Sequence, residues 1–273
     1  MIDLLLWPLV NGLLVASLLA LAGVALFLRG SGWQALASCQ SAAAGGVVAS
    51  TMGLAVTPVA LLAALVALGV MRRAGPGGDA RTSGDPARMP LAVFLLATAL
   101  TSLLAANLAA ASLAAARWVE GEILFAVASD VVWAFGLAVL TLAALPKLTG
   151  RWLAEQCEPD CSAQASAAGV RTKRLGQGLD LMWMTLVLVL GARTLGVPAA
   201  LAVLLFPAWA AARTASSFRG FLISSQLLAL AAMVAAWAPT VLWDQPFAPS
   251  LVLANAALAA MVVLASFTRR GLS

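Results

Sequence analysis

The chain alternates between long runs of apolar residues and short polar segments. Positions 4–28 form the first apolar run, and a small, polar segment at 31–42 separates it from a second run at 43–71. A helix needs about 20 apolar residues to cross the hydrocarbon core of a bilayer, so the first run predicts one crossing. The second run is longer and has Thr57 and Pro58 near its middle, which predicts either two short helices or one strongly kinked helix.

Six further apolar runs complete the pattern. They occupy positions 91–115, 125–145, 181–190, 197–212, 220–238 and 250–267. Together with the first two runs they predict an all-α, polytopic bundle of transmembrane helices. The bundle has nine crossings if the break near Thr57 separates two helices, and eight if the break is only a kink.

The runs at 181–190 and 197–212 predict a tight helical hairpin. Gly191 and Gly196 favour a loosened helix between the two runs, and Arg193 lies between these glycines, where it can reach a membrane face. Pro198 suits the first turn of the returning helix, because its missing N–H has no partner at that position. Pro207 lies inside the second helix and frees a carbonyl about one turn earlier, which predicts either a wall of a polar pathway or a simple packing kink.

Basic residues are concentrated in particular loops. Segments 72–90 and 146–177 are rich in arginine and lysine, and the chain ends shortly after Arg269 and Arg270. The positive-inside rule places these segments in the cytoplasm, and it leaves the segments around Glu120 and Asp244 outside. Nine crossings then put the N-terminus outside and the C-terminus inside.

Composition supports a membrane protein with one domain, 1–273. The chain is 63% hydrophobic and only 10% charged, whereas soluble domains average about 25% charged residues. The net charge of +5 (16 − 11) is spread over several loops, so membrane lipid is an expected partner and nucleic acid is not. Met1, Ile2 and Asp3 lack the basic start of a secretory signal, so the first run is expected to remain as a helix in the cell inner membrane.

The residue types present exclude several kinds of chemistry. The chain has no histidine, and its three cysteines do not make a disulfide framework. No Walker pattern for nucleotide phosphates is present, so we expect neither an enzyme nor a bound cofactor. Asp130 and Asp180 are the only acids close to apolar runs, and each is expected to complement a helix N-terminus. Carriers driven by protons or sodium usually bury more ionisable groups, so energy is expected to come from a partner.

The long loop at 146–177 contains a second informative stretch. Pro159 and Asp160 suit the first turn of a short helix, and Gly169 suits its C-terminal stop. We expect a short cytoplasmic helix of small residues that either docks on a partner protein or serves as an interfacial linker. The residues that characterise this segment are Glu158, Pro159, Asp160, Ala163, Ala165 and Gly169.

The late hairpin carries a family resemblance. Arg193-x-x-Gly196-Val197, an apolar run, Pro207-Ala208 and then Ser217-Phe218-Arg219 resemble the late hairpin of permease subunits of zinc and manganese ABC importers. The segment at 158–169 resembles the cytoplasmic coupling segment of those permeases. The resemblance implies a homodimer that works with ABC ATPase subunits and an extracytoplasmic solute-binding protein.

One departure from that family concerns the substrate pathway. The family typically has an aspartate and a histidine, four residues apart, after its first helix, and the corresponding positions are Gln34 and Ser38. The expected pathway residues are Gln34, Ser38, Cys39, Gln40 and Pro207, with no metal site among them. The family implies transport of a divalent metal. A permease for a metal chelate or another small polar solute, and a non-transporting membrane scaffold, remain as alternatives.

Overall fold

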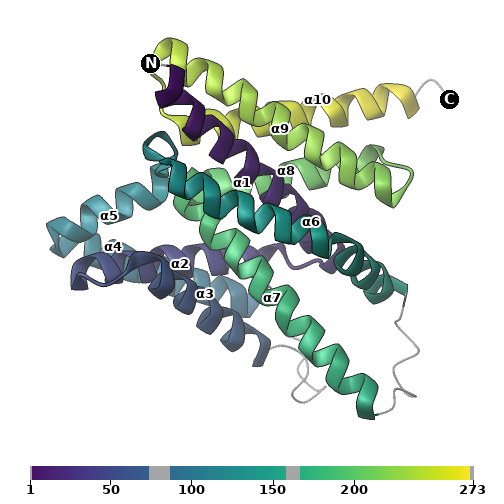
Figure 1. The fold of residues 1–273 in the computed structure, drawn as a ribbon, viewed down its shortest axis with the longest axis horizontal. Coiled ribbons are helices and arrows are strands. Elements are labelled where there is room, and N and C mark those ends of the chain that lie inside the picture. Colours follow the sequence, from purple (N-terminus) through teal and green to yellow (C-terminus); the bar gives the residue numbers. More distant parts are fainter. Residues whose placement is uncertain (1, 74–86, 158–166, 271–273) are drawn as a thin grey trace.

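The computed structural model describes residues 2–73, 87–157 and 167–270 (Figure 1). All regular elements in these ranges are helical, which confirms the predicted all-α class. In chain order the helices are α1 (Ile2–Arg29), α2 (Gly32–Met52), α3 (Val56–Arg73), α4 (Arg88–Asn107), α5 (Ala109–Glu120), the 3₁₀ helix η1 (Ile123–Phe125), α6 (Ala128–Cys157), α7 (Ala167–Leu195), α8 (Val197–Thr214), α9 (Phe218–Trp243) and α10 (Phe247–Arg270).

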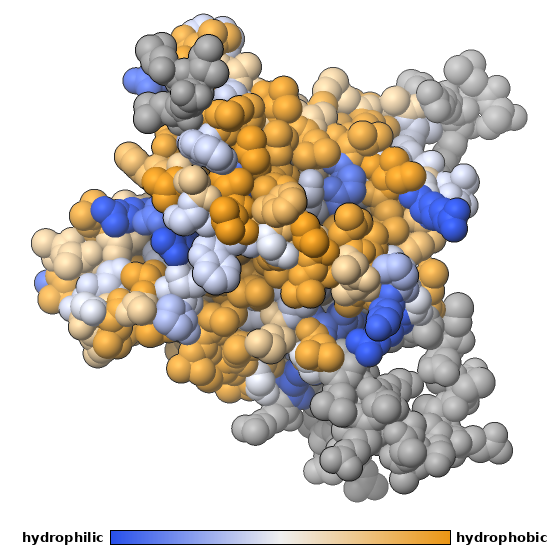
Figure 2. Space-filling model, viewed as in Figure 1, coloured by the Kyte–Doolittle hydropathy of each residue, from blue (hydrophilic) through white to orange (hydrophobic). Residues whose placement is uncertain are grey.

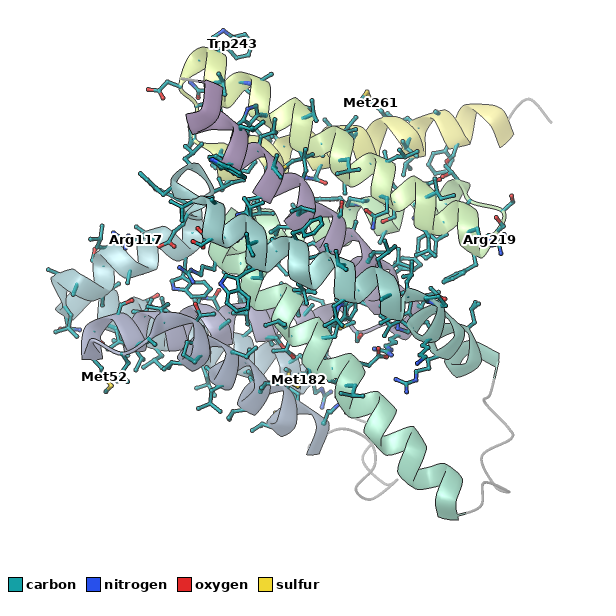
Figure 3. The ribbon with its side chains drawn as sticks, in the orientation of Figure 1. Met52, Arg117, Met182, Arg219, Trp243 and Met261 are labelled. Carbon is teal, nitrogen blue, oxygen red and sulfur yellow. The ribbon has the colours of Figure 1, made fainter. Side chains whose placement is uncertain are left out.

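The helices run back and forth between two ends of the bundle. In Figure 3, Met52 of α2, Arg117 of α5 and Trp243 of α9 lie towards the left, whereas Arg219 at the start of α9 lies on the right. The turn between α7 and α8 lies at the left end, and the C-terminal end of α10 lies at the right (Figure 1). Following the predicted orientation, we call the left end the outer end and the right end the inner end.

Seven of the described helices are long and apolar enough to cross a membrane: α1, α4, α6, α7, α8, α9 and α10. Hydrophobic residues accordingly cover most of the face shown in Figure 2. Helices α2 and α3 run beside these seven and pack against each other. This arrangement agrees with the predicted eight or nine crossings.

One helix break is displaced from its predicted position, and another was not predicted. The long second run is divided at residues 53–55, where Gly53 has a left-handed φ of 68°, and Pro58 lies in the first turn of α3. The single helix predicted at 91–115 is wrong, because the chain breaks at Leu108, which has extended φ and ψ angles of −130° and 119°. The side-chain amide of Asn107 donates to the carbonyl of Leu103 at 2.7 Å. Such local bonds compete with helix continuation.

Two predicted helix ends are also wrong. Helix α6 passes through Pro146 and continues to Cys157, so the predicted loop from 146 is mostly helix. Its extension packs inward, because the rings of Trp152 and Trp183 lie 6.1 Å apart and Trp152 is only 1% exposed. Helix α7 does not loosen at Gly191 but continues to Leu195. A Cβ at Gly191 would lie 2.8 Å from Leu19 Cδ1, so this glycine serves close packing of α7 on α1.

Helix α1 forms the centre of the bundle. It contacts α6, α7, α8 and α9, and two thirds of its apolar window is buried (67%). Much of the core is alanine, and a Cβ at Gly23 would collide with the backbone of Leu204 in α8. Small residues let helix backbones approach closely in a membrane, where packing drives association.

Candidate functional site

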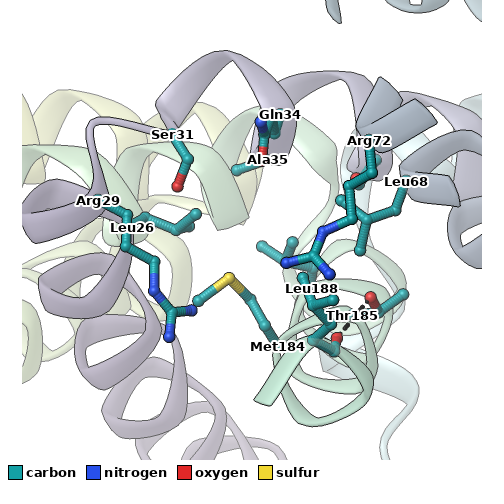
Figure 4. A pocket seen from close by; sticks show the side chains of 12 residues that line it. Leu26, Arg29, Ser31, Gln34, Ala35, Leu68, Arg72, Met184, Thr185 and Leu188 are labelled. Atoms are coloured by element: carbon teal, nitrogen blue, oxygen red, sulfur yellow. Dashed lines mark hydrogen bonds between the residues drawn. The ribbon is translucent and has the colours of Figure 1, made fainter. Parts of the chain in front are cut away.

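A first cavity lies at the inner end between α1, α2, α3 and α7. Its volume is about 240 Å³, and its lining includes Arg29, Gln34, Ser38, Arg72 and Thr185 (Figure 4). Figure 4 shows the side chains of Arg29 and Arg72 approaching the cavity from opposite sides, with Met184 between them. We call this space the inner cavity.

The structure brings together two of the five predicted pathway residues. Gln34 and Ser38 are four positions apart on α2, which places them on one helical face, and both line the inner cavity. Cys39 is fully buried in the main core on another face of the same helix. Gln40 is half-buried, and Pro207 is buried in α8; neither lines a described cavity. The pathway roles of all five residues stay predictions.

One of the arginines that line the inner cavity forms an ion pair. The guanidinium of Arg29, in the last turn of α1, donates to a carboxylate oxygen of Asp180 in α7. The prediction that Asp180 lies near the start of a helix is wrong. Asp180 lies well inside α7, and its side chain is only 2% exposed. Asp130 does follow the prediction, since it lies in the first turn of α6 and accepts the backbone N–H of Val127 at 3.0 Å.

A second, larger cavity opens at the outer end. It has a volume of about 690 Å³ and lies between α1, α3, α6, α7 and the residues that flank η1. Polar residues of its lining are Asn11, Thr57, Glu122, Ser129, Asp130, Arg193 and Thr194, and most of the remaining lining is apolar. We call this space the outer cavity.

A charged cluster borders the outer cavity. The carboxylate of Glu122 lies 3.4 Å from Arg193 Nε and 3.8 Å from Arg117 Nη1. Arg193 also donates to the hydroxyl of Thr57 in α3. The cluster therefore joins the end of α5, the start of α3 and the end of α7 at one point.

Two glycines bring the adjoining turns into backbone contact. Gly121 follows α5 with φ 80°, and Gly196 separates α7 from α8 with φ 87°. A Cβ at Gly121 would lie 2.6 Å from the carbonyl oxygen of Thr194, and a Cβ at Gly196 would lie 3.0 Å from the carbonyl carbon of Val119. We call this contact the outer clasp.

The outer clasp and its charged cluster were not anticipated from the sequence as one assembly. The glycine and arginine of the 193–197 motif pointed to the hairpin alone. Their partners, Gly121 and Glu122, lie about 70 residues earlier, in a short acidic segment for which the sequence predicts only an outer location. The presence of glycines in both segments was the one available signal.

The described residues contain no group of three histidine, cysteine, aspartate or glutamate side chains that could hold a metal ion. Of the predicted coupling residues, Glu158, Pro159, Asp160, Ala163 and Ala165 lie outside the described residues. The prediction that Gly169 ends a helix is wrong, because Gly169 lies in the first turn of α7.

Comparison with solved structures identifies related folds. PsaBC from Streptococcus pneumoniae, solved in complex with a Fab, matches 95% of this chain with a TM-score of 0.75 and 18% identity, over 90% of its own chain. A transporter assigned to the metal-chelate ABC type, in an inward-facing conformation, matches 95% of this chain with a TM-score of 0.71 and 17% identity, over 85% of its own chain. No protein-family profile and no curated protein sequence matches. The chain therefore has the fold of these transporter subunits.

Proposed function

We propose that this chain is the membrane-spanning permease subunit of an ABC importer, located in the cell inner membrane. The observation that carries the proposal is the fold, which follows an ABC transporter structure over 95% of the chain. The hairpin motif at Arg193, Gly196 and Pro207 independently resembles zinc and manganese permeases. The whole chain, 1–273, acts as one permease domain in this proposal.

The proposal assigns ATP hydrolysis to a partner. The sequence contains no Walker pattern, so an ABC ATPase must bind the inner end. The expected contact is the segment at 158–169, which leads directly into α7. Helix α7 contributes Met184 and Thr185 to the inner cavity and holds Arg29 through Asp180. A shift of α7 driven by the ATPase would therefore alter the cavity lining.

The proposed assembly contains two copies of the chain and an extracytoplasmic solute-binding protein. The solute-binding protein would deliver its cargo to the outer end, next to the outer clasp. A second copy would supply the opposite wall of the pathway, within the surrounding membrane lipid. Native mass spectrometry of the purified complex measures directly how many copies of each subunit it contains.

The substrate class proposed from the family is a divalent metal, carried in hydrated or chelated form. Amide and hydroxyl groups at Gln34 and Ser38 bind transition metals more weakly than imidazole, thiolate or carboxylate groups do. A metal chelate is the second candidate, supported by the metal-chelate type of one structural relative. Titration of the purified chain with zinc chloride should show only weak binding. A micromolar site that Gln34→Ala or Ser38→Ala abolishes would contradict this proposal.

Co-purification tests the transporter assignment. The chain should purify with an ATPase encoded beside it, and the complex should hydrolyse ATP faster when loaded solute-binding protein is added. Other small polar solutes belong in the same uptake assay as alternative cargo. A stable complex with membrane partners and no nucleotide hydrolysis would instead support a non-transporting scaffold.

A further inference from the structure

The outer cavity is open along its side, towards the surrounding bilayer. Trp133 and Leu140 of α6 line the cavity and are 78% and 64% exposed, so they form the rim of its opening. The neighbouring side chains Val132 and Phe135 are also exposed and apolar. Helix α6 lies at the front in Figure 1, and this face is mostly hydrophobic in Figure 2. The outer cavity is therefore a groove in a surface that faces lipid.

The groove lies between α3 and α6 and has α7 as its floor. Helix α7 packs against α3, and its Trp183 donates to the hydroxyl of Thr141 in α6 at 2.8 Å. The half-buried Leu186 and Leu190 of α7 line the groove. Gly136 of α6 keeps it wide, because an added Cβ there would meet no atom within 4 Å. An empty apolar groove would lose dispersion contacts, so a lipid chain or another helix must fill it.

The groove has the length of one leaflet of the bilayer. Along α6 its lining runs from Asp130 to Leu140, ten residues that rise about 15 Å. The hydrocarbon core of a bilayer is about 30 Å thick, so this length matches the depth of one leaflet. Its polar groups lie at the outer end, where α3 begins at Thr57 and α7 ends near Arg193. The groove thus has the polarity of one lipid molecule in the outer leaflet.

Arg193 provides a site for a phosphate at the polar end. Its Nε donates to Glu122 and its Nη1 donates to the hydroxyl of Thr57, which leaves further N–H donors of the guanidinium without a partner among the described residues. The Thr57 hydroxyl accepts from Arg193, so its own O–H remains available to donate. Arginine forms strong, charge-assisted hydrogen bonds with phosphate oxygens.

Asp130 provides a site for a cation beside the phosphate. One of its carboxylate oxygens accepts the backbone N–H of Val127 at 3.0 Å, and no basic side chain of the described residues pairs with it. The charged groups of the described lining are Glu122, Asp130 and Arg193, which sum to one negative charge. This balance disfavours a head group with a net negative charge and favours one that carries both a phosphate and an ammonium group.

We propose that the outer cavity binds one phospholipid of the outer leaflet that has an ethanolamine head group. Its acyl chain lies in the groove between α3 and α6, its phosphate binds Arg193 and Thr57, and its ammonium group binds Asp130. A choline head group has no N–H to donate to Asp130. The inference goes beyond the proposed permease function, since it requires only that the chain spans a membrane.

The test measures lipid binding to the purified, delipidated chain by native mass spectrometry. The probes are phosphatidylethanolamine, phosphatidylcholine and phosphatidylglycerol with identical acyl chains. One equivalent of phosphatidylethanolamine should bind about tenfold more tightly than either of the others, because it alone makes the charge-assisted hydrogen bond to Asp130 without added negative charge. It should also raise the Tm most, since a ligand of the folded chain stabilises that state.

Two glycines of α6 provide a matched pair of variants for the groove. Gly136 lines the outer cavity and Gly150 does not, and an added Cβ would meet no atom within 4 Å at either position. Gly136→Phe should fill the groove and weaken phosphatidylethanolamine binding about tenfold or more, whereas Gly150→Phe should leave binding unchanged.

The head-group contacts have their own variants. Asp130→Asn keeps a side-chain oxygen for the N–H of Val127 but removes the charge, so it should abolish the preference for ethanolamine over choline. Arg193→Gln should weaken binding of all three lipids. Arg117→Gln is its control, because Arg117 also contacts Glu122 but does not line the outer cavity, and this variant should bind lipid as the parent chain does.

Three results would overturn the inference. They are equal binding of the three lipids, equal binding by Gly136→Phe and the parent chain, and an intermolecular disulfide formed in membranes by Gly136→Cys in a cysteine-free background. The disulfide would show that a second copy covers the groove. Stimulated ATP hydrolysis by the complex with the partner ATPase tests the permease assignment separately, and that assignment stands whichever lipid result is obtained.

Discussion

Substitution of Gly121 by alanine should disrupt the outer clasp. The residue has φ 80° and ψ 165°, a region that is essentially restricted to glycine and costs other residues about 1–3 kcal/mol. The new methyl group would also lie 2.6 Å from the carbonyl oxygen of Thr194, against backbone that cannot rotate away. Overpacking of this kind costs about 1–3 kcal/mol. Together the two effects predict a loss of about 2–6 kcal/mol.

Gly53→Ala is a control for a positive φ without a steric clash. Gly53 also has a positive φ, 68°, but an added Cβ there would meet nothing within 4 Å. This control should lose only the cost of the left-handed conformation, about 1–2 kcal/mol. Part of that loss is offset, because alanine restricts the unfolded chain more than glycine does.

Thermal unfolding of the purified chain in detergent, followed by tryptophan fluorescence, measures the difference. Gly121→Ala should lower the Tm clearly more than Gly53→Ala. The double variant Gly121→Ala/Gly196→Ala should lose less than the sum of the single variants, because both glycines serve one contact. Equal Tm values for Gly121→Ala and Gly53→Ala would refute the idea that backbone interlocking stabilises the outer end.

Three further experiments address the inner end and the orientation. Asp180→Asn should lower the Tm, and Arg29→Gln should recover part of that loss in the double variant, as a thermal-unfolding cycle would show. Ala163→Arg should abolish stimulation of the partner ATPase without changing the Tm, because a groove for small residues has no space for arginine; unchanged stimulation would contradict docking of this segment. In a cysteine-free background, cysteine at Gln245 should react with an impermeant reagent from outside intact cells, whereas cysteine at Gly75 should not. Equal labelling of both cysteines from outside would contradict the predicted orientation.

Features that depend on local chemistry could be predicted from the sequence. Pro198 lies in the first turn of α8 as expected, because its missing N–H has no helical partner there. Gln34 and Ser38 share a helical face because helical periodicity alone brings residues four apart together. The division of the long run at 43–71 followed from its length, although the break lies a few residues before Thr57.

Features that depend on tertiary contacts could not be predicted in this way. Pro146 is a strong local signal for a helix end, yet α6 continues, and its extension packs Trp152 against Trp183. Gly191 resembles a helix breaker in the sequence, but its role is to leave room for the side chain of Leu19 in α1. The break at Leu108 lies within an alanine- and leucine-rich stretch that contains neither glycine nor proline. Local propensity is a weak guide where packing decides the outcome.

Helix α2 has a consequence for how the protein is made. Among the described helices of 20 or more residues, α2 alone is not apolar enough to count as a membrane span. Most of its residues are buried against neighbouring helices. The insertion machinery tests segments largely by their apolarity as they emerge, so α2 alone is a poor candidate for release into lipid. We therefore expect α2 to enter the bilayer together with α3, the helix against which it packs most extensively. Biogenesis of the inner cavity is therefore a cooperative event between successive segments of the nascent chain.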